Sequence, residues 1–290
     1  MSRFLISMGL IGSLNYISLQ SAPAQETDSS TSSDPWKQQV TGITLIPGQQ
    51  ADSGLLTDQT TEVRLDMVFV PGGKFKMGCN IGGSDESPVH EVVVDDFYIG
   101  KYEVTQHQWR LIMEQDTNKC YFEGCDSCPV ERVSWYNVME FIQKLNEKTK
   151  MNYRLPTEGE WEYAARGGSI SKGYKYSGSN SDVSVAWKVG ISSARTHLIG
   201  RKKPNELGIY DMSGNVFEWC ADWYSSTWYQ VSPRSNPAGP AEGTYRVMRG
   251  GSWFYDYAGL RVTDRESANP TYRYGYVGFR LCRSASTAGF

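Results

Sequence analysis

Histidine is scarce in this chain, and its three copies, His90, His107 and His197, are widely separated in the sequence. No two of them have the i, i+4 spacing of a helical zinc site, and no cluster indicates a non-haem iron centre. The sequence also lacks a Gly-x-Ser-x-Gly nucleophile motif and a glycine loop that could cradle a phosphate. We therefore expect the three histidines to make ordinary surface or core hydrogen bonds.

Basic runs are missing too, and the charges nearly balance. The chain has 290 residues, with 29 Lys and Arg against 32 Asp and Glu and a formal net charge of −3. Without a basic patch, neither nucleic acid nor an anionic membrane surface is an expected partner. The length suits one or two domains. An aromatic content of 13% and 29 glycines favour an irregular, turn-rich fold over a helical bundle.

Residues 1–24 have the pattern of a cleavable secretory signal peptide. Arg3 precedes a mostly apolar stretch over residues 4–19, and small residues at the cleavage site end at Ala24. An uncleaved anchor is the alternative, but the stretch is short and interrupted by polar side chains. We expect a periplasmic or secreted protein that is cleaved near Ala24 and has no membrane contact afterwards. Residues 25–60, rich in Ser, Thr, Asp, Gln and Gly, are predicted to be a disordered linker.

Export makes the six cysteines candidates for disulfides, and their even number predicts two or three bridges. Cys120, Cys125 and Cys128 form a cluster, which lacks the second cysteine pair that a zinc site would need. We expect a local disulfide there that leaves one cysteine to reach further. The sequence leaves the pairing open, and the other three are Cys79, Cys220 and Cys282.

The pattern of apolar residues predicts an α+β fold with short antiparallel strands, about three helices and long loops. Residues 65–70 and 74–77 flank a Pro-Gly-Gly turn and predict a hairpin. Three residues are expected to cap helices: Thr105, Ser134 and Thr157.

Residues 204–223 mix turn formers, carboxylates and large aromatics with no helical or strand period. Aromatic side chains favour burial, whereas carboxylates resist it unless they are paired or bound to a cation. Asp211 and Glu218 flank a tight turn, so their carboxylates and the turn's carbonyls can form an oxygen cage that suits calcium. The alternative is that Asp211 forms an Asx-turn and Glu218 pairs with an arginine.

Five ordered motifs resemble the formylglycine-generating enzyme family, also called the sulfatase-modifying factor domain. They are Met67 to Gly78, Pro129 to Trp135, Tyr153 to Gly168, Pro204 to Trp223, and Arg249-Gly-Gly-Ser-Trp253 with Gly278-Phe-Arg280. The resemblance implies one domain over residues 61–286 with the family's irregular fold, which is related to C-type lectins. It also implies a structural calcium, with side-chain ligands at Asp211 and Glu218 and carbonyl ligands at Gly214 and Val216.

Oxygen-dependent members of that family bind copper(I) through two cysteines that follow the Gly-Gly-Ser turn. Residues 253–265 contain no cysteine, so copper is not expected, because copper(I) requires soft thiolate ligands. The segment instead carries acids and phenols, including Tyr255, Asp256 and, just beyond it, Glu266. Such groups can transfer protons or hold a phenolic substrate. Ser252 of the Gly-Gly-Ser turn is a candidate substrate-positioning hydroxyl.

A copper-less, exported branch of the family matures the siderophore pyoverdine and relies on a glutamate in this region. The resemblance implies an oxidoreductase-like enzyme for a small phenolic or peptidic substrate, with Glu266 as a catalytic candidate. Glu266 is alternatively a solvated loop acid paired with Arg265 or Arg273. A non-catalytic binding or assembly module on the same fold is the second hypothesis, since fold does not fix function. Formylglycine generation on sulfatases is the third.

Overall fold

The computed structural model describes the backbone of residues 51–58, 61–114 and 119–285. The predicted signal peptide, residues 1–24, and most of the predicted linker, residues 25–60, lie outside these ranges. Within them, no helix is both long enough and apolar enough to cross a membrane.

The three predicted helices begin directly after their predicted capping residues, Thr105, Ser134 and Thr157. They are α1 (Gln106–Met113), α2 (Trp135–Thr149) and α3 (Glu158–Ala165). Each capping hydroxyl accepts a hydrogen bond from the backbone N–H three residues further on, which satisfies a donor that the first turn leaves unpaired. The described residues also contain the one-turn helix α4 (Asp182–Val185) and 3-10 turns at 84–86, 168–170 and 228–230.

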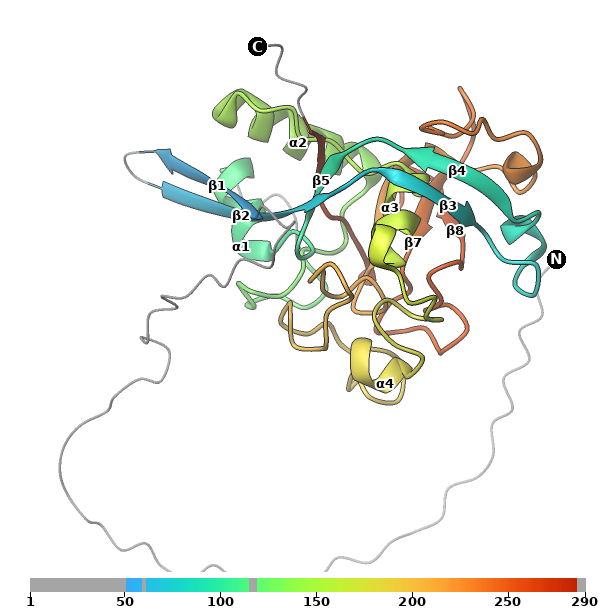
Figure 1. The fold of residues 1–290 in the computed structure, drawn as a ribbon. Coiled ribbons are helices and arrows are strands. Elements are labelled where there is room, and N and C mark those ends of the chain that lie inside the picture. Colours follow the sequence, from blue (N-terminus) through green and yellow to red (C-terminus); the bar gives the residue numbers. More distant parts are fainter. Residues whose placement is uncertain (1–50, 59–60, 115–118, 286–290) are drawn as a thin grey trace, which may run out of the picture. The chain divides into compact units, whose positions relative to one another are not determined.

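Short strands form three sheets, as the α+β prediction required (Figure 1). The first has the order β1 (Ala51–Asp58), β2 (Thr61–Val70), β5 (Phe97–Gly100) and β10 (Cys282–Ser284). The second pairs β3 (Gly73–Met77) with β4 (His90–Val94). The third has the order β8 (Glu266–Ala268), β7 (Arg246–Arg249), β6 (Phe217–Trp223) and β9 (Val277–Gly278). All pairs are antiparallel except β6 with β9.

Two sequence predictions about the strands differ from the structure. Strand β1 lies in the stretch predicted to be a linker, so regular structure begins ahead of residue 61. The expected hairpin does not form, because β2 pairs with β1 and β5 whereas β3 pairs with β4. At the turn between them, the Gly72 amide donates to Asp96 at 2.7 Å, and a Cβ on Gly72 would lie 2.5 Å from the carbonyl oxygen of Val94. The turn therefore places β3 against β4 rather than against β2.

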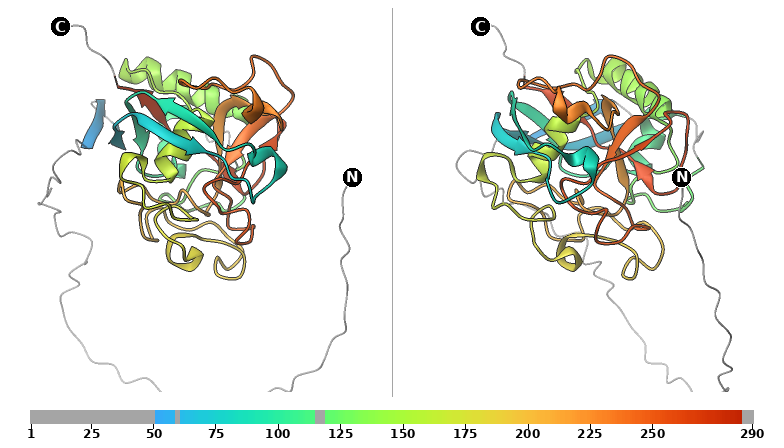
Figure 2. Two further views of the ribbon diagram at one scale, coloured as in Figure 1. Left: turned by 45° about the vertical axis from the view of Figure 1, so that its right-hand side comes forward. Right: turned by 90° about the vertical axis from the view of Figure 1, so that its right-hand side faces the viewer.

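The core has two main parts, which lie on either side of the central strands. One part contains α1, α2 and one face of β2, with the rings of Trp109 and Phe141 stacked at 5.2 Å. The other surrounds α3, every residue of which is buried. Long loops around α4 lie on the side of the domain opposite α2 (Figures 1 and 2).

All six cysteines lie in the described residues, and a single disulfide, Cys125–Cys128, joins two of them. This confirms a local bridge in the 120–128 cluster. The prediction of two or three bridges was wrong, because Cys220 and Cys282 are fully buried in the core and neither reaches a second sulfur.

Candidate functional site

The turn between Asp211 and Glu218 is held by its backbone and by Asn215. Gly214 has φ +90°, and a Cβ there would lie 2.4 Å from the carbonyl oxygen of Trp187, so only glycine fits. The Asn215 side chain accepts from the amide of His197 at 2.9 Å and donates to Glu103 at 2.7 Å. Because these partners come from distant segments, the turn is fixed from several sides.

Asp211 has one carboxylate oxygen engaged and the other spare. Its Oδ2 accepts from the amide of Gly200 at 2.6 Å, whereas its Oδ1 is buried without a hydrogen-bond partner in the described part of the chain. Burial raises the pKa of Asp211 to about 6. An unpaired buried oxygen costs free energy, and a bound cation would remove that cost.

Glu218 is paired with an arginine, as the alternative interpretation proposed. Its carboxylate accepts from Arg280 Nη2 at 2.5 Å and Arg280 Nε at 2.6 Å, and Trp161 Nε1 donates to it at 2.6 Å. The carboxylate therefore has few lone pairs left for a metal.

Glu103, between β5 and α1, is a third buried acid at this place that the sequence did not single out. Its Oε1 accepts from the amide of Val216 at 3.2 Å. Burial, followed by the charges of Asp211 and Glu218, raises the pKa of Glu103 well above its usual range. In the sequence, Glu103 stands between Tyr102 and Val104, just before the helix cap Thr105. This placement was the signal that could have indicated a buried acid.

These contacts test the expected calcium site. Asp211 fits, because it has a spare buried oxygen in a region where three acids face two cations, Arg280 and Lys202. Gly214 and Val216 lie in the turn between the two acids, and Glu218 would share its oxygens with Arg280. The described residues contain no group of three or more His, Cys, Asp or Glu side chains arranged to hold a metal. A calcium here would rely on carbonyl ligands for much of its shell.

The predicted catalytic residues lie in and after the Gly-Gly-Ser turn. In the structure some of them are buried and others are exposed. Ser252 is fully buried, and its Oγ accepts from the amide of Phe254 at 3.3 Å. Asp256 is exposed and accepts from the amide of Ala258 at 2.9 Å, within its own loop. In the part of the chain that the structure describes, no hydrogen bond joins either residue to Glu266.

Glu266 is the first residue of β8, and its charge acts on two phenols, Tyr255 and Tyr276. It is half-buried, and burial raises the pKa of its carboxyl. Burial, followed by the charge of Glu266, raises the pKa of Tyr255 to about 12. Burial, followed by Tyr274 and then Glu266, raises the pKa of Tyr276. The alternative pairing with Arg265 is not present, because that guanidinium donates to both oxygens of Glu158 at 2.7 and 2.8 Å.

Rings continue from this carboxyl to the surface as an aromatic ladder, which we define as Phe254, Tyr255, Tyr272, Tyr274 and Tyr276. Tyr274 and Tyr276 stack at 5.0 Å and Phe254 stacks on Tyr276 at 6.0 Å. The end members Phe254 and Tyr272 are 59% and 51% exposed. Exposed stacked rings next to a polar group are typical of a binding surface for a flat or aromatic ligand.

Asp264 is a titratable residue of the same segment that the sequence did not rank among the candidates. Burial raises its pKa to about 7, against the opposing effect of Arg261 and Arg249. Its Oδ1 accepts from Arg261 Nη2 at 3.0 Å. The pKa of Asp264 depends on the residues that surround it in the folded protein, so the sequence alone did not indicate that it is raised.

The thiols near the core are poor ligands for copper(I). Burial raises the pKa of Cys220 and Cys282 well above the usual range, which keeps both protonated. A cavity of ≈ 580 Å³ lies elsewhere, between β2 and the start of α1. None of the predicted catalytic residues lines it.

The chain matches the model of a known family over most of its length. A model described as the sulfatase-modifying factor enzyme 1-like domain matches residues 52–285.

Several named proteins are similar in sequence. The chain is 36% identical over 259 residues to the chaperone protein LppX of Paenibacillus barcinonensis, covering 72% of this chain and 86% of that protein. It is 36% identical over 286 residues to the formylglycine-generating enzyme of Streptomyces coelicolor, covering 75% and 89%. It is 34% identical to the serine/threonine-protein kinase pkn1 of Chlamydia pneumoniae, of which it spans only 38%.

Two solved structures have a similar fold. Treponema denticola variable protein 1 has a TM-score of 0.72 at 30% identity, over 82% of this chain and 99% of that one. PvdO from Pseudomonas aeruginosa has a TM-score of 0.67 at 28% identity, over 77% of this chain and 95% of that one.

Proposed function

Because this chain belongs to the sulfatase-modifying factor family, we propose that it is a copper-independent, oxidoreductase-like enzyme for a small phenolic or peptidic substrate. The observation that carries the proposal is the half-buried carboxyl of Glu266 beside Tyr255 and Tyr276. The fold likeness to PvdO supports a relationship with the copper-less branch.

Glu266 is suited to act as a general base. A carboxylate whose pKa is raised by burial takes up a proton more readily than an exposed one. The aromatic ladder leads from solvent to this carboxyl, and the ring of a phenolic substrate can stack against the rings of the ladder. Ser252 and Asp256 would position the loop rather than touch the substrate, because one is buried and the other bonds within its own turn.

For a catechol substrate the reaction balances with dioxygen as the oxidant. Glu266 takes one phenolic proton, and the more electron-rich phenolate then gives electrons to dioxygen. The substrate loses two electrons and two protons and leaves as the quinone. Dioxygen gains them and leaves as hydrogen peroxide.

The test measures oxygen uptake by the full chain with catechols and with tyrosyl peptides, and substrate binding in parallel. We expect Glu266→Gln to lower the rate by about 10²–10⁴-fold while binding changes little, because a general base acts on the chemical step. Glu140→Gln is the control, since Glu140 is exposed on α2 and pairs only with Lys144. An unchanged rate in Glu266→Gln would remove this residue as the base.

A non-catalytic binding or assembly module is the second candidate. The exposure of Phe254 and Tyr272 favours it, as does similarity to proteins named a chaperone and a variable protein. On this hypothesis oxygen uptake is absent in the wild type, whereas Phe254→Ala weakens the binding of tyrosyl peptides. Formylglycine generation ranks last, because residues 253–265 carry no cysteine to hold copper.

The proposal includes a structural calcium at Asp211, Gly214, Val216 and Glu218, which would fix the long loops. It also includes export to the periplasm or medium with cleavage near Ala24. N-terminal sequencing of the mature protein tests the cleavage, and an intact first residue would contradict it.

A further inference from the structure

We propose that Cys125 and Cys128 form a thiol–disulfide exchange site that oxidises dithiols in peptides. The two cysteines are three residues apart, with their Cα atoms at 5.3 Å, and only Asp126 and Ser127 separate them. This site lies apart from Glu266 and does not depend on the function proposed for that residue.

The disulfide is not needed to hold its loop. The carbonyls of Cys128 and Asp126 accept from the amides of Gln106 and His107, the first two residues of α1, at 3.0 and 3.1 Å. The carbonyl of Ser127 accepts from a third segment, at the amide of Ile199, at 3.0 Å. A bridge across two residues also closes a very short loop, which constrains the unfolded chain little. Reduction therefore leaves the loop in place.

The two sulfurs differ in access. Cys125 is half-buried, whereas Cys128 is 4% exposed. An incoming thiolate can therefore reach the sulfur of Cys125 first, and Cys128 is the leaving group. Because exchange depends on access to the attacked sulfur, this difference directs the mixed disulfide to Cys125.

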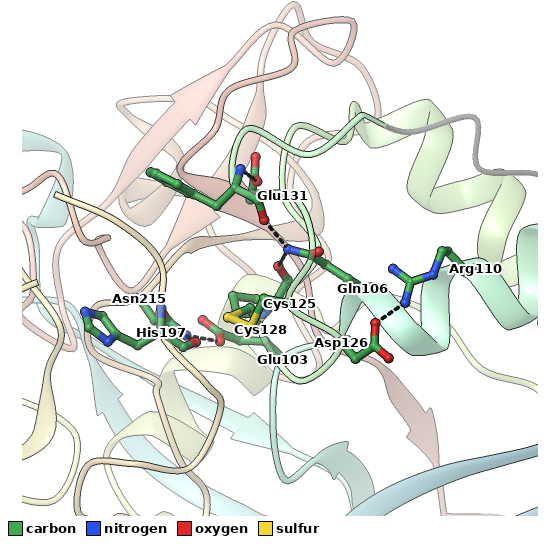
Figure 3. The surroundings of a disulfide bond; sticks show 11 residues. Glu103, Gln106, Arg110, Cys125, Asp126, Cys128, Glu131, His197 and Asn215 are labelled. Atoms are coloured by element: carbon green, nitrogen blue, oxygen red, sulfur yellow. Dashed lines mark hydrogen bonds and ion pairs between the residues drawn. A yellow bond between two sulfur atoms is a disulfide. The ribbon is translucent and has the colours of Figure 1, made fainter. Parts of the chain in front are cut away.

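A positive group offsets the charge of the acid between the two cysteines. Figure 3 shows Asp126 turned toward Arg110, which pairs with it, and away from the sulfurs. His107 lies 4.0 Å from the same carboxylate. The loop also rests on the first turn of α1, where the helix dipole is positive.

A substrate segment has a place to bind beside the pair. Asp126 and Ser127, the two residues between the cysteines, line the cavity of ≈ 580 Å³ together with Thr105, Gln108 and residues of β2. A peptide bound in this cavity would contact the cysteine loop at Asp126 and Ser127. The exchange chemistry, rather than the cavity, sets the ligand class as a peptide that carries two thiols.

The reaction balances without another group. A substrate thiolate attacks the sulfur of Cys125, the Cys125–Cys128 bond breaks, and Cys128 takes up a proton as a thiol. The second substrate thiol then attacks the mixed disulfide at the substrate sulfur and releases Cys125. The substrate loses two electrons and two protons, which the cysteine pair gains. A small disulfide, such as oxidised glutathione, restores the pair.

The experiment incubates the full chain with a synthetic dithiol peptide and follows alkylated cysteines by mass spectrometry. We expect one disulfide peptide formed per Cys125–Cys128 bond reduced, with the near-UV circular dichroism of the protein unchanged. Cys128→Ser should trap a mixed disulfide with glutathione at Cys125, whereas Cys125→Ser should trap at least tenfold less at Cys128. Cys79→Ser is the control, because it removes the other partly exposed cysteine.

Two outcomes would overturn the proposal. One is a bond that the peptide reduces only when the protein unfolds, which makes it a purely structural bridge. The other is equal trapping at both sulfurs. If a single variant fails to fold, the wild-type stoichiometry and circular dichroism still decide between exchange and a structural bridge.

Discussion

The guanidinium of Arg280 holds both carboxylate oxygens of Glu218, and neither side chain is more than 1% exposed. Arg280 follows β9 and Glu218 lies in β6, the two strands that form the parallel pair. The ion pair therefore joins the C-terminal segment to the calcium candidate turn.

Removing one partner of this pair should be strongly destabilising. We expect Arg280→Met to lower the free energy of unfolding by about 3–5 kcal/mol, because it leaves a buried carboxylate without its cation. Urea denaturation measures the change. The exposed pair Lys144–Glu140 is the matched control, and Glu140→Ala should cost less than about 1 kcal/mol. Similar costs for the two variants would contradict a tightly paired Glu218.

Gly214 should tolerate no side chain, for a reason beyond its backbone angle. Gly208 has a similar φ of +79°, but a Cβ there would meet no atom within 4 Å, whereas a Cβ at Gly214 would lie 2.4 Å from the Trp187 carbonyl oxygen. Gly208→Ala should cost about 1–2 kcal/mol from its left-handed backbone alone. Gly214→Ala should cost clearly more, in the same urea assay. Equal losses would show that the turn can move away from Trp187.

Calcium should stabilise the domain through Asp211. We expect millimolar calcium to raise the melting temperature and a chelator to lower it, because a ligand that binds only the folded state stabilises it. Asp211→Asn should remove most of this response, and metal analysis should find calcium but negligible copper. A wild-type melting temperature that does not change when calcium is added would argue against the site.

Asp264 should make stability depend on pH. Its folded pKa of about 7 lies above the ordinary value of 3.8, so the folded state binds more protons between these two values. The contribution of Asp264 to stability is therefore fully present below pH 3.8 and is lost as the pH rises toward 7. We expect the stability difference between wild type and Asp264→Asn to shift against the wild type over this range. A constant difference across that pH range would contradict the raised pKa.

The sequence predicted most reliably those structural features that depend on residues close together in the chain. Thr105, Ser134 and Thr157 each begin a helix because the cap lies within three residues of the amide that it satisfies. The family motifs likewise identified the domain, since they combine many such local requirements. The hairpin failed because the partner of β3 is chosen by contacts at Gly72 with residues more than twenty positions away.

The candidate site was only partly accessible from the sequence. Asp211 and Glu218 were found because they flank a visible turn, but Glu103 reaches the same place from another segment. The raised pKa of Asp264 arises from burial, which no single residue reveals. The bridges were overcounted because an even number of cysteines says nothing about which of them the core encloses.

Strand β10 completes the first sheet by pairing with β5, so residues 282–284 lie against residues 97–99. Almost the whole domain must leave the ribosome before that edge is covered. A chain that stops just short of Cys282 would leave this edge of β5 without its partner strand. In this protein, the first sheet can therefore be completed only after synthesis of the domain is nearly over.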